Sequence, residues 1–284
     1  MFMITKNTNE MSKLMNGNAE IIKFYCVSQI NKAYNDEDII FPSQYEPSPT
    51  GHSSEYFTTT VVSGSNLYWS GSTTANTLSY SKNDGAWSEP SSAITVNVVA
   101  GDVVRWKGVE GQMNPIMSGS NYLGIGSFSQ TSMSNVAYFD CQGNVMSLLY
   151  GDNFRGQTDL TDYPYAFAGL LSRTKAREIG DIALPATTLS EACYVNMFNN
   201  CYSATTAPEL PAKTLVTRCY QNMFNNCESL NYIKMLATDI SATNCLNSWV
   251  AFVAPSGTFV KDASMTTLPT GTSGIPSGWT VQDA

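Results

Sequence analysis

A passage of eighteen residues occurs twice in the C-terminal half of the chain. Residues 184–201 and 210–227 are identical at thirteen of the eighteen aligned positions, and Leu184 of the first copy corresponds to Leu210 of the second, an offset of 26 residues. Compositional bias alone does not produce two aligned segments with this level of identity. A repeat with a period of this length predicts a solenoid, in which each copy packs against its neighbours.

Degraded copies flank the two intact ones. Cys245 follows Cys219 at the same offset, Trp249 takes the place of Met223, and a weaker copy precedes the first, around residues 165–171. Terminal copies of a solenoid meet water on one side instead of a neighbour, so they are expected to differ from the consensus. The outer copies are therefore predicted to be caps.

Large apolar residues in each copy are four positions apart. Cys193, Met197 and Cys201 form one series, and Tyr194 and Phe198 form another. This spacing places the apolar groups on one face of an α-helix. The Leu-Pro pair that opens each copy is expected at the end of a short strand, because proline removes a ladder donor. Each copy thus predicts a strand, a turn, a helix and a turn.

The part of the chain before the repeats divides into two. Residues 11–34 mix helix formers with a loose apolar period, and three prolines follow between residues 42 and 49; this predicts a helical anchor and a proline-rich linker over residues 1–50. From residue 55 on, β-branched and aromatic residues are frequent, and Asn83-Asp84-Gly85 supplies the residues of a tight hairpin. A small antiparallel β-sandwich is predicted over residues 51–135.

Composition and charge exclude several classes of function. The chain is 43% hydrophobic and only 13% charged, with a net charge of −8, so it offers no basic face for nucleic acid. No apolar run approaches the roughly 18 residues that span a bilayer, and the N-terminus lacks the order of a signal peptide. We expect a protein made in a cytoplasm, without membrane insertion, whose seven cysteines are reduced thiols.

Residues for catalysis or metal binding are scarce. The one histidine, His52, lies in the predicted linker, and no Cys-x-x-Cys pair occurs, so the usual triads and zinc sites are not expected. Asp152, Asp159 and Asp162 fall in one polar loop that could hold calcium, but they lack the alternation of an EF-hand and are interpreted as solvated turn carboxylates. We predict no enzyme activity, no cofactor and no metal.

Aromatic residues in the predicted sandwich allow two interpretations. Tyr68, Trp69, Trp87 and Trp106 could form a platform for sugar rings, or they could fill the core. A small sandwich needs a few large aromatic side chains in its interior, so core packing is the expected role.

The repeated text resembles that of a known family. The passages Leu-Pro-Ala-x-Thr-Leu and Cys-Tyr-x-Asn-Met-Phe-Asn-Asn-Cys resemble the BspA-type leucine-rich repeats of Bacteroidales surface proteins and of their gut phages, the crAss-like phages. Residues 151–160 and 274–281 resemble the flanks of such arrays, and a weaker similarity extends to residues 80–87 and 99–104. The resemblance covers roughly residues 80–284 and leaves the first fifty residues unmatched.

Together, the patterns and the resemblance predict a multi-domain fold, mainly β with α/β repeats. Its parts are an N-terminal helical anchor with linker (1–50), a small antiparallel β-sandwich (51–135) and a short C-terminal leucine-rich-repeat-like solenoid with caps (136–284).

The chain departs from the bacterial surface members of that family in ways that favour a phage. Only two copies are intact, the leader peptide is missing, and a helical segment with a linker takes its place. The resemblance therefore implies a virion protein of a bacteriophage, a head fibre or tail-associated structural protein that is assembled in the host cytoplasm. Residues 1–50 would dock on other virion proteins, and the repeats would mediate host attachment.

Two further readings remain. The chain could be a bacterial cell-surface binding protein with leucine-rich repeats. A carbohydrate-active enzyme is disfavoured, since no paired carboxylates stand out. For the phage protein, the resemblance implies a homotrimer at the virion surface, with a host polysaccharide or surface protein as partner.

A binding surface is expected where the two intact copies differ while the scaffold stays fixed. The variable positions expected to be exposed are Ser190, Glu191, Ala192 and Val195 in the first copy, and Val216, Thr217, Arg218 and Gln221 in the second.

Overall fold

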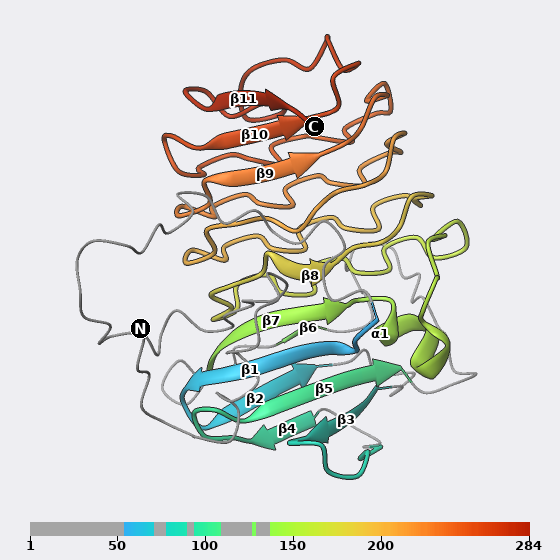
Figure 1. Ribbon diagram of the computed structural model, residues 1–284, viewed down its shortest axis with the longest axis vertical. Helices are drawn as coiled ribbons and strands as arrows, with labels where there is room; N and C mark the ends of the chain where they lie inside the picture. The colour runs from blue at the N-terminus through green and yellow to red at the C-terminus, as the bar shows by residue number, and fades with distance from the viewer. Residues whose placement is uncertain (1–53, 71–77, 90–93, 109–126, 129–136) are drawn as a thin grey trace, which may run out of the picture. The chain divides into compact units, whose positions relative to one another are not determined.

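The computed structural model describes residues 54–70, 78–89, 94–108, 127–128 and 137–284, all within the unit Glu46–Ala284. The elements in chain order (Figure 1) are β1 (Phe57–Ser63), β2 (Asn66–Ser70), β3 (Leu78–Lys82), β4 (Ile94–Asn97), β5 (Val103–Gly108), β6 (Ser127–Phe128), β7 (Tyr138–Asn144), α1 (Ser147–Tyr150), a 3₁₀ turn (Gly151–Asn153), β8 (Asp181–Ala183), β9 (Tyr232–Met235), β10 (Thr258–Lys261) and β11 (Thr280–Asp283). The helical anchor and linker expected over residues 1–50, and His52, lie outside the described residues.

Two sheets pack against each other in the first part of the described chain. The larger has the strand order β3-β5-β1-β7-β8, and the smaller has the order β4-β2-β6. Trp69 on β2 stacks on Trp106 on β5 with ring centroids 5.5 Å apart, and both rings are buried. The Trp106 indole donates through Nε1 to Thr59 Oγ1 on β1 (3.1 Å). The stacked indoles join the two sheets, and the hydrogen bond to Thr59 satisfies the buried N–H group of Trp106.

The hairpin predicted at Asn83-Asp84-Gly85 is confirmed. Asn83 and Asp84 have φ angles of 50° and 59°, and the Gly85 amide donates to the Lys82 carbonyl oxygen (2.9 Å). The turn is tied to its neighbour by Asp102, whose Oδ1 accepts from Asn83 Nδ2 (2.7 Å).

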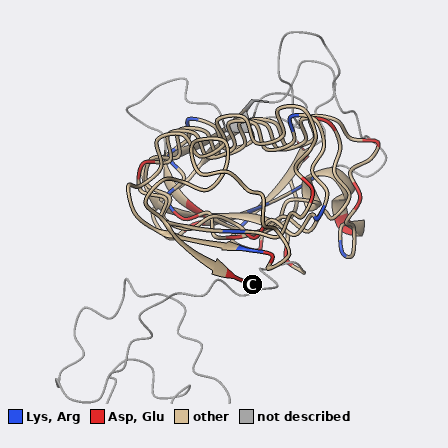
Figure 2. Ribbon diagram, turned by 90° about the horizontal axis from the view of Figure 1, so that it is seen from above, with Lys and Arg blue, Asp and Glu red and all other residues tan. Residues whose placement is uncertain are grey.

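The chain then winds into a coil that continues the larger sheet. β7 pairs antiparallel with β1 and parallel with β8, and the last sheet, β9-β10-β11, is parallel throughout. Tyr232 pairs with Thr258, so the offset of 26 residues in the sequence is also the offset between β9 and β10. Figure 2 shows the strands on one side of the coil and a row of small loops on the opposite side.

The row of loops consists of overlapping β-turns, which we call the turn segments: residues 163–174, 190–201, 216–227 and 242–252. In residues 192–201, odd-numbered amides donate to the carbonyl oxygen three residues back, as in Met197 N to Tyr194 O (3.2 Å). Even-numbered amides donate to the next coil, as in Phe198 N to Met223 O (2.9 Å). Every amide in this run therefore has a partner, which a buried backbone requires.

This alternation places every fourth residue in the left-handed conformation. The φ angles of Ala192, Asn196 and Asn200 are 53°, 56° and 63°. The next copy repeats them at Arg218, Asn222 and Asn226. Asparagine tolerates this conformation better than most residues other than glycine, which explains its recurrence in the repeat.

The expected fold class, mainly β with α/β repeats, is wrong, because the turn segments contain no α-helix. Among the described residues, α-helix is confined to α1. The four-residue spacing of Cys193, Met197 and Cys201 fits a helical face, but it fits a spiral that repeats every four residues equally well. Amides bond three residues back or to the next coil, whereas a helix would bond them four residues back.

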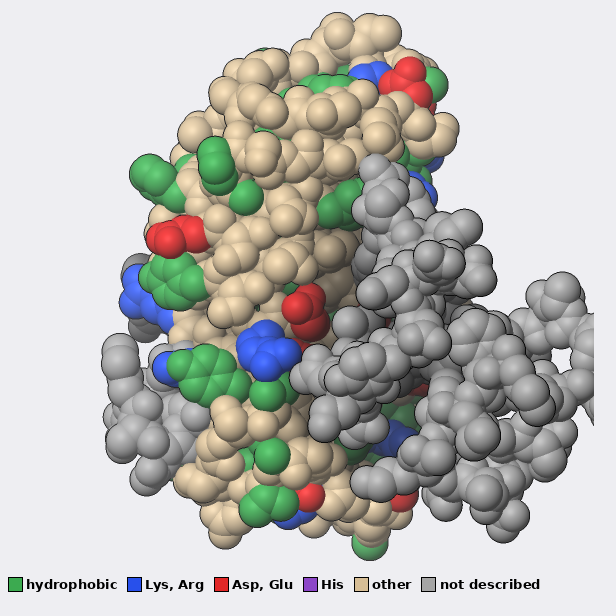
Figure 3. All heavy atoms as spheres, turned by 60° about the vertical axis from the view of Figure 1, so that its left-hand side comes forward, with side chains coloured by type: hydrophobic (Ala, Val, Ile, Leu, Met, Phe, Trp, Pro, Cys, Tyr) green, Lys and Arg blue, Asp and Glu red, His purple; other side chains and the backbone are tan. Residues whose placement is uncertain are grey.

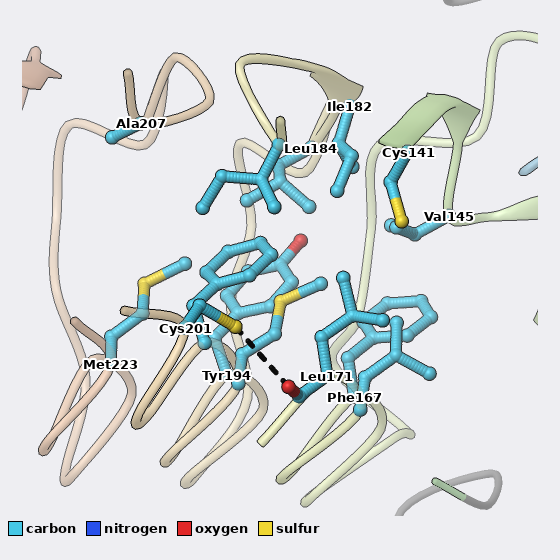
Figure 4. Close-up of a cluster of buried hydrophobic side chains, with 14 of the residues drawn as sticks. Cys141, Val145, Phe167, Leu171, Ile182, Leu184, Tyr194, Cys201, Ala207 and Met223 are labelled. Atoms are coloured by element: carbon cyan, nitrogen blue, oxygen red, sulfur yellow. Dashed lines mark hydrogen bonds between the residues drawn. The ribbon is translucent and has the colours of Figure 1, made fainter. Parts of the chain in front are cut away.

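One hydrophobic core runs from Phe57 to Trp279 and through both the sheets and the coil. Equivalent side chains of neighbouring coils stack inside it: Phe198 lies on Phe224 with ring centroids 5.4 Å apart and an interplanar angle of 3°. Figure 4 shows the coil interior filled by such groups. The large residues that the copies share are therefore the core of the scaffold.

The six cysteines among the described residues are free and buried. The second cysteine of each intact copy donates a hydrogen bond to the preceding coil, Cys201 Sγ to Leu171 O (3.2 Å; Figure 4) and Cys227 Sγ to Phe198 O (3.1 Å). These thiols act as small apolar groups with a weak donor.

Substituting a core thiol tests this role. Cys219 is fully buried, so Cys219→Ser should lower the free energy of unfolding by about 1–3 kcal/mol, because a hydroxyl replaces a packed thiol. Cys219→Ala, the control, removes the same atom without adding a polar group and should cost less. Denaturant unfolding measures both, and a serine variant as stable as the parent would contradict the assignment. The melting temperature of the parent should not change with reductant.

The contribution of the Asp102 carboxylate to the stability of the fold depends on pH. Lys82, at 2.7 Å from Oδ2, Asn83 and the Val99 amide lower the pKa of Asp102 from 3.8 to about 2. Because the folded-state pKa lies below the usual value, this stabilisation is complete above about pH 4 and is lost as the pH falls through about 2. Asp102→Asn should cost about 1–2 kcal/mol at pH 7, and the gap to the parent should narrow between pH 4 and pH 2. Urea midpoints across this range test it; a gap that stays constant would contradict it.

Candidate interaction surface

The positions at which the two copies differ do not form one open surface. They lie in the first half of two neighbouring turn segments, and their exposure varies widely. Glu191 is exposed; Val216, Thr217, Arg218 and Gln221 are half-buried; and Ser190, Ala192 and Val195 are buried. The structure thus brings five of the eight to the surface in part or in full and covers three.

Ala192 and Val195 are covered by neighbouring coils. They form a small apolar cluster with Ala168, and Tyr165 packs on it. Coils that share β-type hydrogen bonds lie only about 4.8 Å apart, so small side chains on the outside of one coil touch those of the next. These side chains are buried between the first two turn segments and are not available to a ligand.

Ser190 has a structural partner as well. Its Oγ donates to the Tyr163 carbonyl oxygen (2.6 Å), which satisfies one acceptor of the preceding coil. The Ser190 hydroxyl therefore stabilises the packing of one coil on the next.

The exposed residues of this set include an ion pair between Arg218 and Glu191. Arg218 donates through Nη2 to Glu191 Oε1 on the preceding coil, and to the Tyr165 hydroxyl one coil further (3.2 Å). Three successive coils are thus joined by one guanidinium. Exposed pairs of this kind contribute about 0–1 kcal/mol, so their main effect is to fix the positions of the charges.

The aromatic residues of the sandwich divide between core and surface. Trp69 and Trp106 are buried, as core packing predicts. Trp87 is half-buried; Lys107 Nζ lies 4.4 Å from its ring centroid, and Tyr56 packs on its edge at 5.1 Å. Tyr68 is half-buried as well, and because two of the four rings lie in the core, the four residues do not form a single platform.

Two of the three loop carboxylates considered for calcium, Asp152 and Asp159, have protein partners. Asp152 pairs with Lys107 (2.7 Å) and accepts from the Tyr56 hydroxyl (2.5 Å). Asp159 accepts from the amide and the hydroxyl of Thr161 at 2.7 and 2.6 Å. These contacts lower the pKa of both carboxyl groups. No group of three or more potential ligands that could hold a metal ion occurs within the described ranges.

The thiols are poorly suited to nucleophilic catalysis. Burial raises the pKa of Cys193 and of Cys201 to about 12, and it also raises the pKa of Cys227 and Cys245. A thiolate is the reactive form, so these groups stay protonated at neutral pH.

Exposed aromatic residues outside the predicted set are more accessible than most of its members. Tyr138, Tyr202 and Phe252 expose 41%, 52% and 72% of their surface. Tyr202 stands where the next copy has Glu228, and this difference is visible in the sequence just after the second cysteine. Phe252 occupies the position that corresponds to Asn226 of the preceding copy. This correspondence becomes clear only when the degraded third copy is aligned with the second.

In comparisons with protein-family models, curated proteins and solved structures, nothing matches this chain. Within the described part of the chain, no helix is long and apolar enough to cross a membrane.

Proposed function

We propose that this chain is a structural appendage protein of a bacteriophage particle, a head fibre or tail-associated protein displayed at the virion surface. Residues 1–50 dock on other virion proteins, and the coil within residues 136–284 is presented to the host surface. The chain binds and does not catalyse, and it works as a homotrimer.

The observation that carries the proposal is the contrast in burial between the residues that the copies share and most of the residues that differ. Residues shared by the copies, such as Tyr194, Met197 and Phe198, are buried in one core, while five of the eight variable positions are exposed in part or in full. Such an arrangement supports a display scaffold, in which surface residues change without cost to folding. The resemblance of the repeated text to repeats of phages of Bacteroidales supports the virion setting.

The surface chemistry agrees with binding through neutral polar groups. Charged residues make up only 13% of the chain, and Figure 3 shows them as isolated spots on a mostly uncharged face. Weak contacts of one chain gain strength when a particle displays many copies, because each further contact becomes intramolecular.

Complementation of a phage that lacks this gene tests the docking role. Full-length chain should appear in purified particles by mass spectrometry, whereas residues 51–284 should melt cooperatively but stay out of particles, because they retain the core and lack the docking segment. Normal incorporation of the shortened chain would remove the docking role of residues 1–50. Absence of the full-length chain from particles would overturn the proposed function.

A further inference from the structure

Exposed aromatic side chains gather along one edge of the coil. Of the five large hydrophobic residues exposed among the described residues, Tyr138, Tyr202 and Phe252 lie at the end of the turn segments or next to it. Figure 3 shows hydrophobic side chains spaced along the left-hand edge of the molecule, with polar and charged surface between them. An isolated exposed aromatic is common, but an ordered series is not.

Hydrogen bonds establish that this series follows successive coils. Lys175 Nζ donates to the Tyr138 hydroxyl (3.0 Å) and lies 4.5 Å from its ring centroid. The Arg173 backbone amide donates to the Asn199 carbonyl oxygen of the following coil (2.8 Å), which places Tyr202 where the earlier coil has Lys175. The Tyr202 hydroxyl donates to Asn200 Oδ1 (2.8 Å). We call the edge formed by these residues, together with Asn226 and Phe252, the edge strip.

The strip continues through the next two coils. Asn226 Nδ2 donates to Asn200 Oδ1 (3.2 Å), and the Asn226 amide donates to the Ala251 carbonyl oxygen (2.8 Å), next to Phe252. The aromatic rings therefore belong to every second coil. Since neighbouring coils lie about 4.8 Å apart, the rings recur at about 10 Å along the stack. Lys175 lies between Tyr138 and Tyr202, and Asn226 and the exposed Glu228 lie in the coil between Tyr202 and Phe252.

Phe252 carries a conformational cost that packing does not repay. Its φ angle is 59°, the left-handed conformation that the two intact copies give to Asn200 and Asn226. An aromatic residue is disfavoured in this conformation, and with 72% of its surface exposed it gains little from burial. A strained and exposed side chain of this kind points to a role in binding.

We propose that the edge strip binds an extended chain of a neutral polysaccharide, a proposal that rests on the host-surface role argued above and names its ligand. The C–H face of a pyranose ring is apolar and packs on an aromatic ring, while its hydroxyls exchange hydrogen bonds with amides that both donate and accept. In an extended β-linked chain every second sugar presents the same face, at about the interval of the rings.

A second copy of the chain fits the strip less well. Stable protein interfaces need about 1,000 Å² of continuous, complementary surface, whereas here Lys175, Asn226 and Glu228 separate the rings. The net charge of −8 disfavours acidic polysaccharides, so the neutral class is favoured.

Affinity electrophoresis of the full-length chain in gels that contain hydroxyethylcellulose, xylan, galactomannan or mannan tests the proposal. At least one of these polymers should retard the chain. Tyr202→Ala should weaken the retardation at least about tenfold, Tyr202→Phe should retain most of it, and Val99→Ala, which shortens an exposed hydrophobic side chain outside the strip, should not change it.

Phe252→Asn separates binding from folding. The variant should be as stable as the parent or more stable, because asparagine suits the left-handed conformation, yet it should bind the polymer at least about tenfold more weakly. No retardation by any of the four polymers, or equal retardation of parent and Tyr202→Ala, would overturn the proposal. So would a change of oligomeric state on Tyr202→Ala in analytical ultracentrifugation, which would assign the strip to self-association. If particles contain the chain and still adsorb to host cells after Tyr202→Ala, the strip is rejected and the proposed function stands.

Discussion

The structure of the coil depends on how the backbone amides of the turn segments are shared. Amides alternate between a carbonyl oxygen three residues back and one on the next coil, as Met197 and Phe198 show. Neither set alone would satisfy the buried backbone. Because the second set fixes the register between coils, each copy must have nearly the same length, and the left-handed residue must recur at every fourth position, which is where Asn196 and Asn200 lie.

A fixed register places equivalent side chains on top of each other. Phe167, Tyr194 and Tyr220 form one aromatic stack in the core, and the second cysteine of each intact copy reaches a carbonyl oxygen of the preceding coil. On the outside, the same register aligns groups from different coils, such as the guanidinium of Arg218 with Glu191. A ligand that lies along the stack therefore meets groups at intervals set by the coil spacing. The proposed polysaccharide site uses this property, which no single copy possesses.

Some of these features could be predicted from the sequence, and others could not. The offset of 26 residues is visible in the text, and the hairpin at Asn83 follows from its turn residues. The turn conformation was missed because a spacing of four apolar residues fits both a helix and a four-residue spiral; the asparagines between them were the distinguishing signal. Ala192 and Val195 differ between the copies, yet variation does not distinguish an exposed side chain from one buried between coils. Tyr165, which covers them, lies in another copy and is not linked to them by local sequence.

Scalar couplings across hydrogen bonds, measured by NMR on deuterated protein, test the sharing of amides most directly. The sharing of amides predicts a coupling between the Phe198 amide nitrogen and the Met223 carbonyl carbon, and another between the Met197 nitrogen and the Tyr194 carbonyl carbon. An α-helix would couple each nitrogen to the carbonyl carbon four residues back. A coupling from Phe198 to Tyr194, in place of the one to Met223, would contradict the account.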